Sequence, residues 1–155
     1  MAGSRIPILS KTRINPTLGS GFTILTLARE VETSAVREAA LVVQVHGTPT
    51  FTSLTGVNVY AWAVAPTGDD PGYDFVIRSS TGTLSPVKLA TVTIPLTGYS
   101  NLTSNNYWAT LAPVNINSTT QQGNFGAHLR IVLEIDASST PTVDFYLSVD
   151  LDVKS

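Results

Sequence analysis

The C-terminal segment 142–154 alternates apolar and polar side chains without a break. Successive side chains on a β-strand point to opposite faces, so this pattern predicts one long strand with an apolar face and an acidic face. The apolar positions are Val143, Phe145, Leu147, Val149, Leu151 and Val153, and the acidic positions are Asp144, Asp150 and Asp152. Such a strand cannot bury its apolar face alone and requires a second sheet or a barrel wall opposite it.

Shorter segments with strand patterns fill much of the remaining chain, and residues that favour turns separate them. They are 22–28, 39–45, 56–65, 73–78, 87–94 and 126–135, with a short edge strand at 107–111. About eight strands and no convincing helix predict an all-β antiparallel sandwich, with a jelly roll preferred and an immunoglobulin-like sandwich as the alternative. The expected core is Leu41, Val43, Val45, Val57, Val59, Leu129, Ile131, Leu133, Val143, Phe145, Leu147, Val149 and Leu151.

Two of these strand segments carry apolar or aromatic side chains on both faces. Segment 22–28 is apolar at both phases, which predicts a strand covered on both sides, with the arm or another subunit as the cap. Segment 56–65 places small residues on one face and a ridge of Tyr60 and Trp62 on the other, and we expect that ridge to be part of the core.

The length of 155 residues is enough for one domain with a single core. We expect residues 21–155 to form a β-sandwich domain and residues 1–20 to form an extended arm, with an ordinary first strand as the alternative. In the arm interpretation, the segment lies along a neighbouring subunit, and Arg5 and Arg13 meet acidic faces such as that of Asp144, Asp150 and Asp152.

The composition is poor in charge, with 43% hydrophobic and only 13% charged residues. A surface with few charges suits a protein that contacts copies of itself or a larger assembly, although an ordinary β-protein rich in Ser and Thr fits as well. The net charge of −2 and the scattered basic residues predict no nucleic-acid partner. Neither a signal peptide nor a membrane span is visible, so we expect no membrane association.

No catalytic constellation is visible in the sequence. His46 and His128 lie far apart and in no metal-ligand spacing, and cysteine is absent. There is no nucleophile elbow of the Gly-x-Ser-x-Gly type, and carboxylates on a flat, solvated strand face do not form a glycosidase pair. We therefore expect no enzymatic activity, no metal and no cofactor.

The aromatic residues admit two interpretations, and the sequence does not separate them. Rings near Asn side chains are typical of sugar-binding sandwiches, which predicts a glycan site at Tyr99, Asn101, Asn105, Asn106, Tyr107 and Trp108. Tyr and Trp are also enriched as anchors in the charge-poor centres of subunit interfaces. That alternative predicts an interface made by Arg5, Ile6, Ile8, Leu9, Arg13, Ile14, Tyr60, Trp62, Tyr107 and Trp108.

The chain resembles the small jelly-roll decoration or head-stabilising proteins of tailed bacteriophage capsids. The resemblance rests on segment 1–20, segment 39–46, the loop 66–72 and the alternating strand that ends at Lys154. It implies a structural protein of the virion, made in the host cytoplasm, that forms homo-oligomers, often trimers. Such oligomers sit on the outer surface of a shell of major capsid protein, with arms that bridge neighbours.

Overall fold

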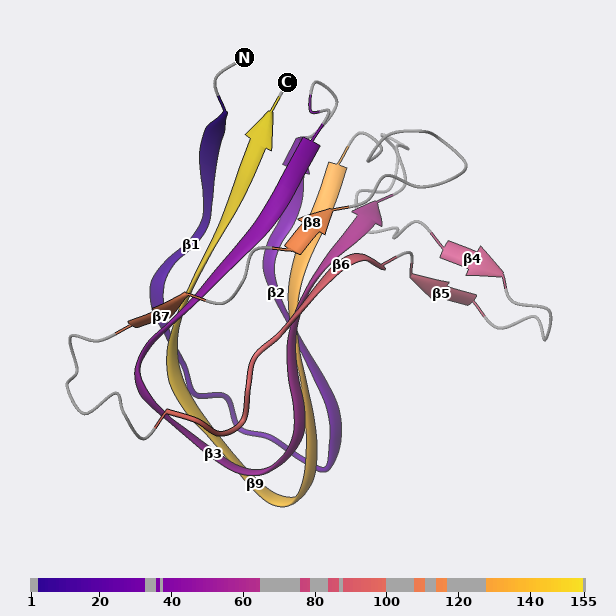
Figure 1. Ribbon diagram of the computed structural model, residues 1–155. Coiled ribbons are helices and arrows are strands. Elements are labelled where there is room, and N and C mark those ends of the chain that lie inside the picture. Colours follow the sequence, from indigo (N-terminus) through magenta and orange to yellow (C-terminus); the bar gives the residue numbers. More distant parts are fainter. Residues whose placement is uncertain are drawn as a thin grey trace.

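Figure 1 shows the computed structural model of the protein. The structure describes residues 3–32, 36, 38–64, 76–78, 84–86, 88–99, 108–110, 114–116 and 128–154. None of these residues is helical, and the regular elements among them are all β-strands. The fold is therefore all-β, as the sequence predicts.

Two long strands form the frame of the molecule. Strand β3 (Glu38–Val64) and strand β9 (His128–Lys154) pair antiparallel from one end to the other, starting at Glu38 opposite Lys154 and finishing at Val64 opposite His128. Both strands bend in the middle, so the two-stranded ribbon doubles back on itself (Figure 1). The two halves of this one ribbon supply the central strands of two layers that face each other.

The first layer, here called sheet I, contains β1 (Ser4–Ile14), residues 142–154 of β9 and residues 38–52 of β3, in that order. Two short strands pair with the other edge of β3. They are β7 (Trp108–Thr110) and β8 (Val114–Ile116).

The second layer, here called sheet II, contains β2 (Gly21–Glu32), residues 128–137 of β9, residues 54–64 of β3 and β6 (Lys88–Thr93). Each layer thus has four strand positions, which agrees with the predicted sandwich of about eight strands. Strands β4 (Val76–Arg78) and β5 (Leu84–Pro86) form a separate two-stranded sheet.

The bend of the ribbon is made by residues that leave the regular strand conformation. Gly47, Ser53 and Thr140 have positive φ angles of 72°, 55° and 50°. The pairing register of β3 with β9 also shifts between His46 and Thr50 and again between Thr52 and Gly56, as β-bulges do when they bend a strand. The chain therefore crosses from sheet I to sheet II without losing its hydrogen-bonded partner.

The core lies between the two sheets and is lined by the inward phase of each strand. Every residue of the expected core is buried, so the alternation in the sequence located the core correctly. Phe145 is 2% exposed and packs edge-on against Phe51, with ring centroids 5.2 Å apart. The adjacent side chain, Tyr146, points outward and is 43% exposed.

Residues 4–14 are a strand of sheet I in this structure, paired with β9 of the same chain, and do not form a free arm. This is the alternative that the sequence left open. The N-terminal segment runs down sheet I as β1 and returns up sheet II as β2, so it follows the same bend as the central ribbon (Figure 1).

Within this chain strand β2 is covered on one side only, because Phe22 is 69% exposed and Ile24 is 49% exposed. The expected cover of its outer face by another subunit stays a prediction. The expectation that the aromatic ridge of β3 is part of the main core is wrong for Tyr60, because Val57, Val59 and Ala61 occupy the inward phase. Tyr60 is nevertheless buried, in a small separate cluster with Val132 on the other face of sheet II.

We expect Phe145→Ala to lower the free energy of unfolding by roughly 3 to 5 kcal/mol, because it removes a packed ring from between the sheets. Tyr146→Ala, one residue away on the opposite face, is the matched control and should change stability far less. Urea unfolding followed by tryptophan fluorescence measures both variants. Equal losses for the two variants would show that the assignment of inward and outward phases on β9 is incorrect.

Candidate functional site

Two bidentate ion pairs tie β1 to β9 on the outer face of sheet I. The Arg5 guanidinium donates from Nε and Nη2 to the Asp152 carboxylate, at 2.7 and 3.1 Å. Arg13 donates in the same way to Asp144, at 2.9 and 2.8 Å. The pairing of these arginines with this acidic face was expected between subunits, and the structure makes it within one chain.

These ion pairs position an edge strand whose pairing is irregular. The register of β1 on β9 shifts between Pro7 and Leu9 and again between Leu9 and Thr12. The charged groups are largely exposed to solvent, and exposed ion pairs stabilise proteins only weakly. Their bidentate geometry instead favours one register of β1.

The hydrogen bond from each arginine, followed by its positive charge, holds the pKa values of Asp144 and Asp152 below the ordinary 3.8. A lowered native pKa means that the stabilisation is present above pH 3.8 and is lost as the pH falls through the native value. We expect the hydrogen-exchange protection of β1 amides, relative to those of β9, to fall below about pH 3.8.

Arg13→Gln should produce the same loss near residues 12–14 already at pH 6, and Lys11→Gln, a nearby change of equal charge, should not. Hydrogen exchange measured by mass spectrometry on peptides from β1 and β9 gives the protection of β1 relative to β9, both for the parent as the pH falls and for the two variants at pH 6. If the protection of β1 were independent of pH and of Arg13, the ion pairs would not hold the strand.

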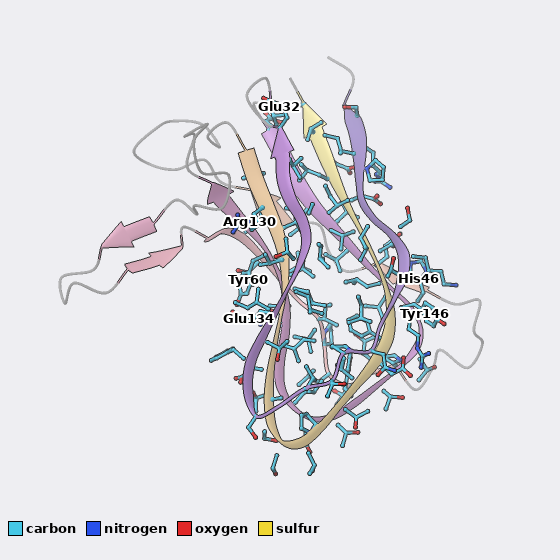
Figure 2. The ribbon with its side chains drawn as sticks, turned by 180° about the vertical axis from the view of Figure 1, so that it is seen from behind. Glu32, His46, Tyr60, Arg130, Glu134 and Tyr146 are labelled. Carbon is cyan, nitrogen blue, oxygen red and sulfur yellow. The ribbon has the colours of Figure 1, made fainter. Side chains whose placement is uncertain are left out.

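A second cluster of polar side chains lies on the same outer face, beside the bend of β3. His46 Nε2 lies 2.8 Å from Ser148 Oγ, and the Ser148 hydroxyl donates to Gln44 Oε1 at 3.1 Å. The Lys11 ammonium lies 5.5 Å from the centre of the Tyr146 ring. Figure 2 shows His46 and Tyr146 together, well away from Tyr60 and Glu134 on the other sheet.

Sequence reasoning did not find this cluster. Residues 44 and 46 have the outward phase of β3, and residues 146 and 148 have the outward phase of β9. The register that places His46 opposite Tyr146 and Gln44 opposite Ser148 is a property of the folded ribbon. The alternation in the sequence indicates only which face of its strand each of these residues occupies.

The Ser148–His46 contact is not arranged as a nucleophile and its base. Because the Ser148 hydroxyl gives its hydrogen to Gln44, its oxygen accepts from His46 instead of donating to it. Ser148 is also only 8% exposed, so a substrate cannot reach its oxygen. Burial, followed by the positive charge of Lys11, lowers the pKa of His46 below 6.5.

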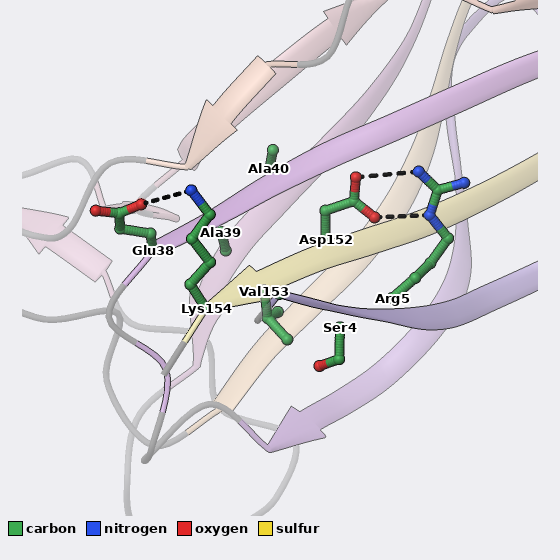
Figure 3. Close-up of a pocket in the computed structure, with 9 residues that line it drawn as sticks. Ser4, Arg5, Glu38, Ala39, Ala40, Asp152, Val153 and Lys154 are labelled. Atoms are coloured by element: carbon green, nitrogen blue, oxygen red, sulfur yellow. Dashed lines mark hydrogen bonds and ion pairs between the residues drawn. The ribbon is translucent and has the colours of Figure 1, made fainter. Parts of the chain in front are cut away.

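A pocket of about 480 Å³ lies at the end of sheet I where β1 begins and β9 ends (Figure 3). Its charged side chains already pair with one another. Arg5 binds Asp152, and the Lys154 ammonium lies 3.5 Å from the Glu38 carboxylate. A charged ligand would have to break one of these pairs. A second pocket, of about 260 Å³, is lined by Lys11, His46, Gly47, Thr48 and Tyr146 and is the better candidate for a binding site.

The outer face of sheet II carries exposed apolar side chains beside a partly buried hydrogen bond. Phe22 and Ile24 project from β2, opposite Asp136 and Glu134 of β9. The Tyr60 hydroxyl donates to Glu134 Oε1 at 3.1 Å. Burial, followed by the negative charge of Glu134, raises the pKa of Tyr60.

Tyr99 belongs to the core, although we expected it in a glycan site. It is 9% exposed and packs edge-on against Phe51, with ring centroids 6.2 Å apart. Burial raises its pKa to about 12, and its hydroxyl has no hydrogen-bond partner among the described residues. Its ring therefore cannot stack on a sugar.

The remaining predicted site residues fall into three groups. Ile14 is buried in the core, and Ile6, Ile8 and Leu9 are half-buried against it. Trp62 pairs in register with Arg130, and Trp108 pairs with His46, so both tryptophans belong to strands. Asn101, Asn105, Asn106 and Tyr107 lie outside the described residues, as does the loop 66–72.

Tyr99→Phe and Tyr60→Phe should change stability in opposite directions. The first removes a buried hydroxyl that has no partner, so we expect the free energy of unfolding to rise by about 1 kcal/mol. The second removes the hydrogen bond to Glu134, so we expect a fall of about 1 kcal/mol. Chemical denaturation of the two variants beside the parent measures both signs, and a destabilised Tyr99→Phe protein would mean that its hydroxyl is satisfied.

The described residues contain no group of three or more His, Cys, Asp or Glu side chains that could hold a metal ion. Within the same part of the chain, no helix is long and apolar enough to cross a membrane.

The chain shares its fold with a solved virus protein. A scan against protein-family profiles and a search of curated proteins found no match. Among solved structures, VP2 of infectious bursal disease virus, in a subviral particle, is similar over 98% of this chain, with a TM-score of 0.50 and 15% identity. A structure of the Gx strain of infectious bursal disease virus matches over the same share, with a TM-score of 0.44 and 14% identity. The chain spans 32% of the first protein and 31% of the second, and identity this low shows the fold alone.

Proposed function

We propose that this chain is a non-enzymatic structural component of a virus particle. The observation that carries the proposal is the fold shared, over nearly the whole chain, with a protein solved as a subviral particle. The resemblance of the sequence to viral jelly-roll proteins supports the same role. VP2 of infectious bursal disease virus, however, is not a protein of a tailed bacteriophage.

The surface of sheet II supports a role in assembly. Strand β2 is an edge of that sheet among the described residues. Its segment Gly21–Ala28 contains no charged residue and no proline, and its pairing with β9 is regular from Gly21 to Thr26, before the register shift at Ala28. Proteins that stay monomeric usually protect edge strands with charge, proline or bulges. Phe22 and Ile24 are exposed on this strand, so it is suited to contact another protein surface.

The finer proposal is a decoration or stabilising protein. It forms homo-oligomers, with trimers favoured, on the outside of a shell of major capsid protein. The charge-poor composition fits repeated protein contacts, and the scattered basic residues fit a position away from the genome. The localisation is then the virion. Of the six residues of the carbohydrate-binding alternative, Tyr99 alone has a described side chain, and its ring is buried.

Replacing both Phe22 and Ile24 with Ser should reduce oligomers to monomers at a given concentration, because the change removes the exposed apolar contact without touching the core. Light scattering at several protein concentrations measures the mass. Tyr146→Ser is the matched control, since it removes an exposed ring from the opposite sheet and should leave the oligomer unchanged.

The assembly proposal also predicts that the purified protein sediments with the shell of its virus, while the Phe22/Ile24 variant does so less or not at all. A parent protein that stays monomeric at high concentration and binds no virion shell would rule the proposal out. A glycan array with a clear hit abolished by Trp108→Ala would then establish the alternative.

A further inference from the structure

We propose that the pocket between β1 and the bend of β3 binds a single oxyanion group, such as sulfate, either free or carried by a sugar. This site goes beyond the structural role proposed above and is independent of it. The pocket has a volume of about 260 Å³ and is lined by Lys11, His46, Gly47, Thr48 and Tyr146.

Lys11 supplies the positive charge. The two arginines of β1 are occupied by Asp152 and Asp144, whereas the Lys11 ammonium contacts only the Tyr146 ring among the described residues. The register shift of β1 between Leu9 and Thr12 leaves Lys11 in the bulged part of the strand, beside the pocket. A cation in contact with a ring and close to solvent can also bind an anion.

His46 supplies a donor whose presence depends on pH. The Ser148 hydroxyl gives its hydrogen to Gln44, so Ser148 Oγ accepts from His46 Nε2–H. The neutral imidazole therefore carries its hydrogen on Nε2, and its Nδ1 has no hydrogen-bond partner in the described part of the chain. A lone pair on Nδ1 repels an oxyanion, while protonation turns the same atom into a charged donor.

The surroundings of His46 are compatible with this proton uptake. Lys11 and Arg13 face it from β1, and Asp144, Tyr146 and Asp150 share its outer face on β9. Asp144 is neutralised by Arg13. Residues 108–110 of β7, which pair with β3 beside His46, contain no titratable group.

The sign of the pH dependence follows from this arrangement. Burial and Lys11 keep the pKa of His46 below 6.5, so the ring is neutral at pH 7.5. A bound oxyanion favours the charged ring, and binding above that pKa takes up one proton. The affinity for the oxyanion should therefore rise as the pH falls, by about tenfold per pH unit. The rise should end once His46 is protonated in the free protein as well.

Sulfate is the probe, because it keeps its charge between pH 5 and 8 while phosphate does not. We expect sulfate, titrated at constant ionic strength with chloride, to shift the NMR signals of the pocket residues far more strongly at pH 5.5 than at pH 7.5. Lys11→Gln should weaken binding by about tenfold at pH 5.5, as expected for the loss of a charge-assisted hydrogen bond.

His46→Gln should remove the pH dependence, because Gln can still bond to Ser148 but does not titrate. Lys154→Gln, which removes an equal charge at the far end of sheet I, should bind as the parent does. Unchanged unfolding midpoints for the three variants would confirm that the differences arise in the pocket.

The source of the group is separated by comparing free sulfate with a sulfated disaccharide and its unsulfated form. Tighter binding of the sulfated sugar identifies a sugar-borne ligand, and equal affinity for sulfate identifies the free anion. The proposal is overturned if sulfate does not bind at pH 5.5, or if it binds equally well to the parent, Lys11→Gln and His46→Gln.

Discussion

The structure depends on the unbroken pairing of β3 with β9. Each strand crosses from one sheet to the other, so the hydrogen bonds of the ribbon continue through the bend while its two halves face each other. The apolar phase of both strands points into the space between the halves, and the other strands extend the two sheets at their edges. The core, the register of the outer clusters and the positions of both edge strands all follow from this ribbon.

The alternation in the sequence predicted the fold class correctly, and every residue that it assigned to the core is buried. The reason is that burial on one face of a strand imposes a period of two. It did not predict that segments 39–45 and 56–65 belong to one strand. Gly47 and Pro49 lie in the bend of β3, and Pro141 lies in the bend of β9. All three are typical turn residues, and a turn was expected to end the strand pairing. A strand stays paired through a bend only if the opposite strand bends at the same place, as β9 does opposite β3.

The candidate site was less predictable than the fold for a related reason. The acidic face and the arginines that bind it were identified, yet the partner was placed on another subunit, since a sequence does not distinguish pairing within a chain from pairing between chains. The contacts of His46 with Ser148 and of Lys11 with Tyr146 need the register across strands. The two edges also differ chemically: β1 carries Arg5, Lys11 and Arg13 along its length, while residues 21–28 of β2 carry no charge and expose Phe22 and Ile24.

Native-state hydrogen exchange over β3 and β9 tests most directly whether one folded ribbon holds the molecule together. Because both sheets share these strands, amides in residues 129–135 and in residues 145–151 should open in one cooperative event. Their exchange should then give the same free energy, equal to that of global unfolding. Two distinct opening free energies, one for each half of β9, would contradict the account, because the sheets would then be separate units joined by a hinge.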